Sequence, residues 1–230
     1  MSPTEAELAR LREFDTPTIC NALEMLEPGR RGYGYTRRGM VAVNAGSSPV
    51  VGVARTATMR SAIRADRAAD TLKRERLEYY EYVHEGSEMP KVCVMQDLDG
   101  DDAGTGPFWG EFNTRIHRAM GVEAVVTDGS VRDVDNLPAD VLLLSRGLRP
   151  SHAFVHIADF GSQVNVFGMS VSHDELVHAD QHGAVAFPSH LIEDVATRAA
   201  EFVAAEAPII AACKADRLSL DELKRLYMAR

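Results

Sequence analysis

The chain has 230 residues, of which 34 are acidic and 25 are basic, and its formal net charge is −9. This surplus of negative charge argues against nucleic acid as a partner, because phosphate binding favours a basic surface. It leaves room for a small anionic substrate held by one local arginine. No stretch approaches the roughly 18 consecutive apolar residues of a membrane span, and the charged N-terminal segment lacks the apolar core of a signal peptide. We therefore expect a cytoplasmic protein that binds neither nucleic acid nor membrane.

Local patterns predict helices alternating with short strands. The segment Ser2-Pro3-Thr4-Glu5 is expected to form a capping box that starts the first helix, and Thr16-Pro17 to start the second. The first expected helix ends near residue 14. The others cover residues 18–26, 62–86, 111–120, 190–205 and 220–228. The expected strands cover 40–43, 50–54, 91–96, 122–127, 141–144, 154–157, 164–167 and 185–187. Such irregular alternation, with short strands in the middle of the chain, favours an α/β fold.

The predicted helix 62–86 is strongly charged and has an irregular apolar face. A surface helix is the simplest interpretation. Two alternatives are that it covers a functional site or contacts a neighbouring subunit.

Several familiar kinds of site are absent from the sequence. Residues 30–40 are basic and rich in glycine without the GxGxxG spacing of a dinucleotide site, and the acidic run 97–102 lacks the glycine and glutamate of an EF-hand. Histidine pairs with zinc-like spacing at 152/156 and 178/182 do not fall on a clear helix. The three cysteines are far apart, as is typical of reduced thiols. The lysines lie among polar or terminal positions, which disfavours a Schiff-base enzyme.

The stretch 109–133 is the most informative part of the sequence. A glycine-rich approach leads into a predicted helix, which Gly121 ends, and a short apolar strand then leads to a polar turn. The first amides of a helix lack intrahelical partners and can hold an anion. In the turn, Arg132 offers a planar fork suited to a carboxylate, and Asp133 offers a hard oxygen suited to Mg²⁺ or Mn²⁺.

The helix in this stretch has an expected buried stripe, formed by Phe112, Ile116, Ala119 and Met120. Glu111 lies off this stripe, at the start of the helix. If the strand runs back beside the helix, Glu111 faces Arg132 and Asp133 across one cleft. Taken alone, the same residues are also compatible with a solvated turn that contains an Asp–Arg pair.

Four segments, in the right order, resemble the RraA-like family, which includes 4-hydroxy-4-methyl-2-oxoglutarate (HMG/CHA) aldolases. The first feature is an acidic residue, twenty intervening residues and then Arg-Asp; here Glu111 and Arg132 are 132 − 111 = 21 positions apart. The others are the segments 52–57, 144–150 and 173–188. The resemblance covers roughly residues 10–195. Glu111 stands where the characterised aldolases more often have aspartate, which puts the substrate preference in question.

The resemblance implies a layered β/β/α core of the swivelling-domain type, with N-terminal helices and a C-terminal helical extension. We expect one domain at residues 1–195, with a helical insertion at about 62–86, and an extension at 196–230. The family resemblance also implies a homotrimer or homohexamer with sites at subunit boundaries. An acidic residue of the adjoining subunit would complete the site, with candidates Glu175, Asp180, Glu193 and Asp194.

The implied activity is that of a metal-dependent (class II) lyase that cleaves the C3–C4 bond of a 4-hydroxy- or 4-carboxy-2-oxo acid to give pyruvate. Arg132 and Glu111 are the expected catalytic residues, and Asp133 with Glu111 the expected ligands of Mg²⁺ or Mn²⁺. Substrate would bind to Arg132 and to the segment Gly110, Glu111, Phe112 and Asn113. The alternative is a non-catalytic trimeric module that regulates a ribonuclease.

Overall fold

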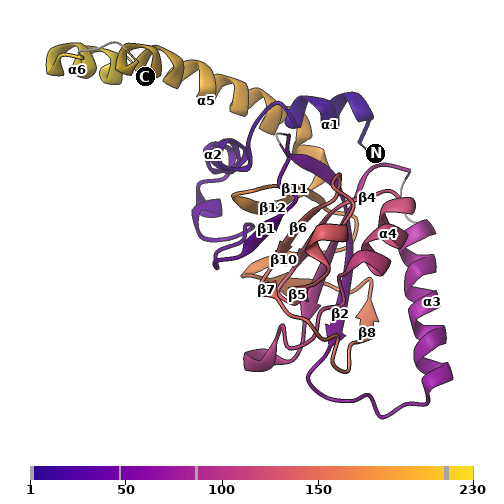
Figure 1. Ribbon diagram of the computed structural model, residues 1–230. Coiled ribbons are helices and arrows are strands. Elements are labelled where there is room, and N and C mark those ends of the chain that lie inside the picture. Colours follow the sequence, from indigo (N-terminus) through magenta and orange to yellow (C-terminus); the bar gives the residue numbers. More distant parts are fainter. Residues whose placement is uncertain (1–2, 47, 86–87, 215–217, 230) are drawn as a thin grey trace.

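The computed structural model describes residues 3–46, 48–85, 88–214 and 218–229 (Figure 1). A strongly curved mixed sheet forms its centre, with strand order β1-β6-β4-β3-β2-β11-β12. Strands β2, β3, β4 and β6 run parallel, and β1, β11 and β12 are joined antiparallel; β8 pairs with the second half of the long strand β2. The bounds are β1 Val41–Val43, β2 Val50–Arg60, β3 Lys91–Asp97, β4 Val122–Thr127, β6 Leu142–Ser145, β8 His156–Phe160, β11 Leu176–Asp180 and β12 Gly183–Phe187.

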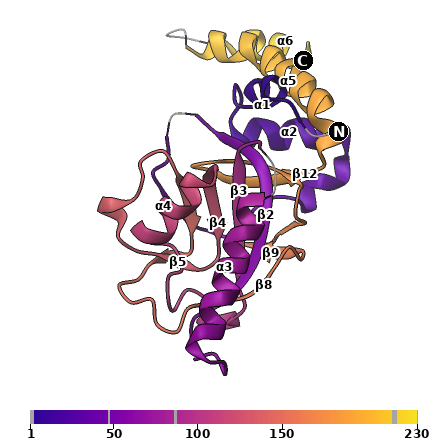
Figure 2. The ribbon, with the colours of Figure 1, turned by 90° about the vertical axis from the view of Figure 1, so that its right-hand side faces the viewer.

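Both faces of this sheet are buried. Because successive side chains of a strand point to opposite sides, each strand contributes to the apolar clusters on both faces. In β3, Val92 and Val94 pack under a hairpin formed by β9 (Val164–Val166) and β10 (Met169–Val171). Cys93 and Met95 face the other way. There they join a second apolar cluster. The helices α3 (Ala69–Glu85) and α4 (Glu111–Ala119) cover that side of the sheet, as both views show (Figure 2). The expected β/β/α layering is therefore confirmed.

A third apolar cluster joins the N-terminal helices to the end of the sheet. It is formed by α1 (Glu5–Leu11), α2 (Thr16–Leu26) and the first part of α5 (Ile192–Cys213), packed on β11 and β12. The last buried residue of α5 is Ala199. The rest of α5 and the following α6 (Leu220–Met228) extend away from the body, and α6 has no buried residue (Figure 1). The boundary expected at residues 195/196 lies within α5.

The structure corrects several of the predicted bounds. The helix expected at 62–86 begins at Ala69. The capping box is formed by Thr4 with Glu7, whereas Ser2 lies outside the described residues. The strand expected at 50–54 continues to Arg60, and the helix expected at 190–205 continues to Cys213 with Pro208 inside it. Strands β10 and β11 were not expected. Short elements complete the fold: η1 Pro28–Gly32, η2 Gly100–Asp102, β5 Ser130–Val131, η3 Val134–Asn136, β7 Gly147–Leu148 and η4 Ser189–Leu191.

Lys91 fixes the two helices that cover the sheet. It lies at the start of β3 with 5% of its surface exposed, which corrects the expectation of a polar or terminal setting. Its Nζ donates to the carbonyl oxygens of His84, in the last turn of α3, at 3.2 Å and of Met120, at the end of α4, at 2.9 Å. A cation suits these carbonyls, because the last turn of a helix leaves them without backbone partners.

We predict that Lys91→Met destabilises the protein by about 1–3 kcal/mol, because it leaves two helix-terminal carbonyls without their donor. The free energy of unfolding, measured with urea, checks this. Lys73→Met is the matched control, since Lys73 lies on α3 with 77% of its side chain exposed. Equal stability of the two variants would contradict the assignment.

Among the described residues, no helix combines the length and the apolar character that crossing a bilayer requires.

Candidate active site

The candidate site lies where the approach to α4 meets the turn after β4. Trp109 and Val131 form a parallel bridge, and the Arg132 amide donates to the Trp109 carbonyl at 3.0 Å. Strand β5 then pairs with β7, and the Arg149 amide donates to the Val131 carbonyl. These backbone bonds set the start of α4 directly beside Arg132 and Asp133.

Gly110 permits this close approach. A Cβ atom at position 110 would lie 2.6 Å from Asp133 Oδ2, 2.9 Å from Arg132 Cγ and 3.1 Å from Arg132 Nε. Gly110 is the N-cap of α4 and supplies no side-chain cap. Asp133 acts in its place, since its Oδ2 accepts from the Glu111 amide at 3.3 Å and lies 3.3 Å from Arg132 Nε. Asp133 adopts a left-handed backbone, with φ 57°, which costs energy for a residue with a side chain.

The buried side of α4 is polar, so the expected apolar stripe was wrong. Phe112 is 71% exposed, whereas Asn113, Thr114 and His117 are buried. The side chains of Asn113 and His117 are tolerated there because they are hydrogen-bonded, whereas the buried Thr114 hydroxyl has no partner among the described residues. Asn113 Nδ2 donates to the Phe108 carbonyl at 2.6 Å, and the Tyr80 hydroxyl donates to Asn113 Oδ1 at 2.7 Å.

His117 ties α4 to α3. Its Nδ1 lies 2.7 Å from the Asn113 carbonyl oxygen, which can only accept, so Nδ1 carries the proton. Its Nε2, 2.9 Å from the Tyr79 hydroxyl, therefore accepts from that hydroxyl. The Trp109 ring lies against the imidazole, with ring centroids 4.5 Å apart. Burial lowers the pKa of His117 to about 4, so the imidazole is neutral near pH 7.

Glu111 lies at the site, but its carboxylate is turned to another partner. Its Oε1 accepts from Arg115 Nε at 2.9 Å, one turn along α4. Arg115 in turn donates to the Asn136 carbonyl in η3. The fold thus brings the Glu111 backbone to Arg132 and Asp133, while the Glu111 side chain points along the helix.

A pocket of about 230 Å³ opens at the start of α4. Its lining contains two arginines and a histidine and no carboxylate: Arg76, Pro107, Phe108, Gly110, Phe112, Asn113, Arg132, His152 and Val155. The amides of Phe112 and Asn113 have no acceptor among the described residues. The groups that line the pocket therefore suit an anion.

Sequence reasoning missed Arg76 and His152 as parts of this pocket. Arg76 belongs to α3, which lies beside α4, and His152 to the segment before β8. The possibility that the charged helix covers a functional site was the only sequence signal for Arg76.

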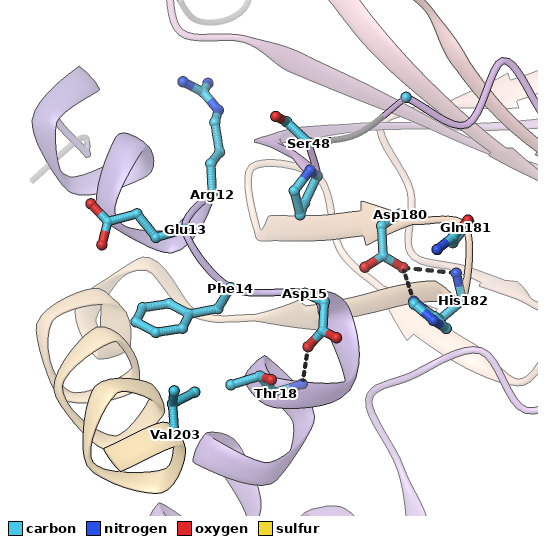
Figure 3. A pocket seen from close by; sticks show the side chains of 12 residues that line it. Arg12, Glu13, Phe14, Asp15, Thr18, Ser48, Asp180, Gln181, His182 and Val203 are labelled. Atoms are coloured by element: carbon cyan, nitrogen blue, oxygen red, sulfur yellow. Dashed lines mark hydrogen bonds and ion pairs between the residues drawn. The ribbon is translucent and has the colours of Figure 1, made fainter. Parts of the chain in front are cut away.

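A larger pocket, of about 480 Å³, lies between the α1–α2 connection, the β11–β12 turn and the middle of α5 (Figure 3). Two of its three acidic side chains already bond to neighbours. Asp180 accepts from the Thr16 amide at 2.7 Å and from the His182 amide at 2.8 Å, and Asp15 caps α2. These bonds give the residues a structural role in joining α2 to the β11–β12 turn.

The family model for RraA-like proteins, described as Aldolase/RraA, matches residues 16–186. The chain belongs to the RraA-like family. The family resemblance expected from the four motifs is thereby confirmed. RraA-like proteins include both aldolases and regulators of ribonucleases, so membership alone does not select the activity. Among curated proteins, none matches the sequence.

Three solved structures illustrate the shared RraA fold. An uncharacterized protein from Pseudomonas syringae pv. tomato str. DC3000 is 20% identical, with a TM-score of 0.71 over 99% of both chains. Streptomyces coelicolor RraAS2, described as an unusual member of the RNase ES inhibitor RraA protein family, is 23% identical, with a TM-score of 0.70 over 90% of this chain and 96% of the other. The RNA-processing inhibitor RraA from Thermus thermophilis is 18% identical, with a TM-score of 0.52 over 74% and 92%. At these identities the similarity establishes the fold alone.

Two carboxylates of this RraA-like chain, those of Asp133 and Glu111, are the candidates for holding a hard cation near the start of α4. Within the described part of the chain, no group of three or more His, Cys, Asp and Glu side chains is arranged to hold a metal. Mg²⁺ often takes only one or two carboxylates and completes its coordination with water and substrate oxygens. The side chains of Asp133 and Glu111 are 39% and 44% exposed and already have partners, Arg132 and Arg115, whose contacts a bound cation would have to replace in part.

We predict that Gly110→Ala disturbs this site more than the fold. The new methyl group overlaps the Arg132 and Asp133 side chains, which move more easily than backbone. A crystal structure should show both side chains displaced from the start of α4, with a melting temperature close to that of the native protein. Gly39→Ala is the control, since a Cβ atom there meets nothing within 4 Å. Unchanged Arg132 and Asp133 positions in Gly110→Ala would contradict the assigned constraint.

We also predict acid destabilisation through His117. Its pKa of about 4 in the folded chain lies below the ordinary 6.5, so the unfolded state binds an extra proton between these values. This contribution to stability is complete above pH 6.5 and is lost as the pH falls towards 4. In His117→Gln the free energy of unfolding, measured with urea, should fall less steeply as the pH decreases across that range, by up to about 1.4 kcal/mol per pH unit. Parallel pH profiles would rule out this role.

Proposed function

We propose that the protein is a metal-dependent lyase that cleaves the C3–C4 bond of a 4-hydroxy- or 4-carboxy-2-oxo acid and releases pyruvate. The observation that supports this most is the arrangement at the 230 Å³ pocket, where the Arg132 guanidinium and the open amides of α4 meet beside the carboxylate of Asp133. Membership of a family that includes aldolases supports the same activity.

The proposed binding mode follows from the charge of each group. The Arg132 fork binds the C1 carboxylate of the substrate, because two parallel N–H bonds match a carboxylate. The amides of Phe112 and Asn113 bind other oxygens of the substrate at the positive end of α4. Asp133 Oδ2, which contacts both the Glu111 amide and Arg132, holds the two anion-binding groups in register.

The chemistry requires a base and a place for negative charge. Glu111 accepts the proton of the C4 hydroxyl as the C3–C4 bond breaks, so that the C4 fragment leaves as a carbonyl compound and the electron pair passes into a pyruvate enolate. With a 4-carboxylate the leaving fragment is carbon dioxide and no base is needed. Protonation of C3 then gives pyruvate. For this role the Glu111 carboxylate must exchange its bond to Arg115 for one to the substrate.

A divalent cation, Mg²⁺ or Mn²⁺, held by Asp133 and Glu111 would supply Lewis-acid polarisation of the 2-oxo group. Arg132 and the helix amides supply fixed positive charge at the same end of the pocket. Preorganised donors of this kind are each worth roughly 10²–10³ in rate. The Asp-to-Glu difference from the characterised aldolases adds one methylene, which gives Glu111 the length to reach either the cation or the substrate.

We further propose that the active form is a homo-oligomer, a trimer or paired trimers, in which an acidic residue of a neighbouring copy completes the site. Two of the candidates already bond within the chain: Asp180 to Thr16 and His182, and Glu175 to the Ser172 amide. Glu193 pairs loosely with Arg10 at 3.5 Å, with 78% of its side chain exposed. Glu193 and its neighbour Asp194 are therefore the better candidates.

The test is pyruvate release from oxaloacetate and from 4-hydroxy-4-methyl-2-oxoglutarate, coupled to lactate dehydrogenase. We expect turnover above the metal-only background with Mg²⁺ or Mn²⁺, and its loss with EDTA. Arg132→Ala and Asp133→Ala should each lower turnover by at least about 100-fold while the fold is retained. Arg118→Ala, on the exposed side of α4 and paired with Asp140, should leave it unchanged. Near-native turnover in Arg132→Ala would refute the mechanism.

A second candidate function is a non-catalytic module that regulates a ribonuclease. The observation in its favour is the arm formed by the end of α5 and by α6, which exposes large apolar side chains: Val203, Ile210, Leu220, Tyr227 and Met228. One of the similar structures is described as an RNA-processing inhibitor, and another as an unusual member of the RNase ES inhibitor RraA protein family. Stoichiometric co-elution with an endoribonuclease of the host, together with no pyruvate release, would favour this function.

A further inference from the structure

We infer that Arg76 is a specificity-determining residue of this pocket, which binds a second carboxylate of the substrate and so selects dicarboxylic 2-oxo acids over monocarboxylic ones. The inference rests on the proposed function, because it takes the first carboxylate to bind at Arg132.

Arg76 lines the pocket from a different element than Arg132. It belongs to α3, whereas Arg132 follows β5, and both line the same 230 Å³ pocket. No carboxylate lines this pocket, and among the described residues no Asp or Glu oxygen lies within ion-pair distance of Arg76. One guanidinium already matches one carboxylate through two parallel N–H bonds. A second guanidinium on the lining of the same small pocket therefore exceeds what a single carboxylate needs.

The position of Arg76 is fixed by its neighbours. Its guanidinium lies over the Phe108 ring, with Cζ 5.2 Å from the ring centroid. Tyr80 follows Arg76 by one turn on α3. Tyr80 donates to Asn113, and Asn113 donates to the Phe108 carbonyl, so the residue beneath the guanidinium is itself tied to α3 and α4.

The contact with Phe108 leaves the donors of the guanidinium available. Arginine has five N–H donors in the plane of the group, and the Phe108 ring lies against its face. These donors can bind a ligand in the pocket. His152 lies on the same lining, where its Nδ1 is already bonded to the Ala153 carbonyl at 2.9 Å.

The selectivity follows from desolvation. A second carboxylate that enters a pocket lined by Phe108, Phe112 and Val155 loses water and needs a charged partner. Arg76 supplies that partner. A monocarboxylic substrate has no second carboxylate for Arg76 to bind. The positive charge of Arg76 then has no partner on the ligand.

A matched pair of ligands tests the inference by binding alone. 2-Oxoglutarate and 2-oxopentanoate have the same five-carbon chain and differ only in the distal carboxylate, and neither has a C4 hydroxyl to cleave. Calorimetry on the Mg²⁺-loaded protein should show that 2-oxoglutarate binds about 10- to 100-fold more tightly, the range expected for a hydrogen bond to a charged group.

Arg76→Met should bring the two affinities together, mainly by weakening the binding of 2-oxoglutarate. Arg76→Lys should keep part of the difference in affinity, because lysine retains the positive charge. Arg74→Met is the control, since Arg74 lies on the exposed side of α3 and bonds to Thr71. Arg132→Ala should weaken both ligands. With a cleavable dicarboxylic substrate, Arg76→Met should raise KM far more than it lowers kcat.

The outcomes separate the two claims. If the native protein binds both ligands and Arg76→Met keeps the native ratio of affinities, Arg76 does not select the distal carboxylate, while the proposed 2-oxo acid site stands. If the native protein binds neither ligand and releases no pyruvate, the proposed function fails, and the inference fails with it.

Discussion

The site depends on one close backbone approach, that of Gly110 to the Arg132–Asp133 pair. The Trp109–Val131 bridge and the bond from the Arg132 amide to the Trp109 carbonyl fix this approach, and the missing side chain at position 110 makes it sterically possible. A carboxylate then caps α4 from a distant part of the chain. As a result, a guanidinium, a carboxylate and free helix amides meet at one point, in positions set by backbone hydrogen bonds, as preorganised binding requires.

The surrounding fold keeps this point rigid. The parallel strands are buried on both faces, by the β9–β10 hairpin on one side and by α3 and α4 on the other. Lys91 holds the C-terminal ends of both helices, and the Tyr79–His117 bond joins their middles. Arg76 and the start of α4, which both line the pocket, are therefore carried by helices fixed to each other as well as to the sheet.

The sequence was sufficient for those parts that depend on short-range order. Neighbouring residues predict three of these parts: the strand β3, the start of a helix at Glu111, and the position of Arg132 and Asp133 after a strand. The polar underside of α4 was not predictable from periodicity, because Asn113 and His117 are buried only through partners on other elements, the Phe108 carbonyl and Tyr79. Arg76 and His152 were missed for the same reason: their place in the pocket depends on how α3 and the segment before β8 pack. The roles of the site residues remain predictions, since the fold alone does not select between a lyase and a regulator.

The most direct test of the central claim needs no knowledge of the natural substrate. If the site stabilises a pyruvate enolate, it must also exchange the methyl protons of pyruvate itself with solvent. In D₂O with Mg²⁺, nuclear magnetic resonance should show the methyl signal of pyruvate decreasing at a rate proportional to protein concentration. The exchange should disappear with EDTA and in Arg132→Ala. A methyl signal that decays no faster with folded, metal-loaded protein than without it would contradict the enolate chemistry assigned to this site.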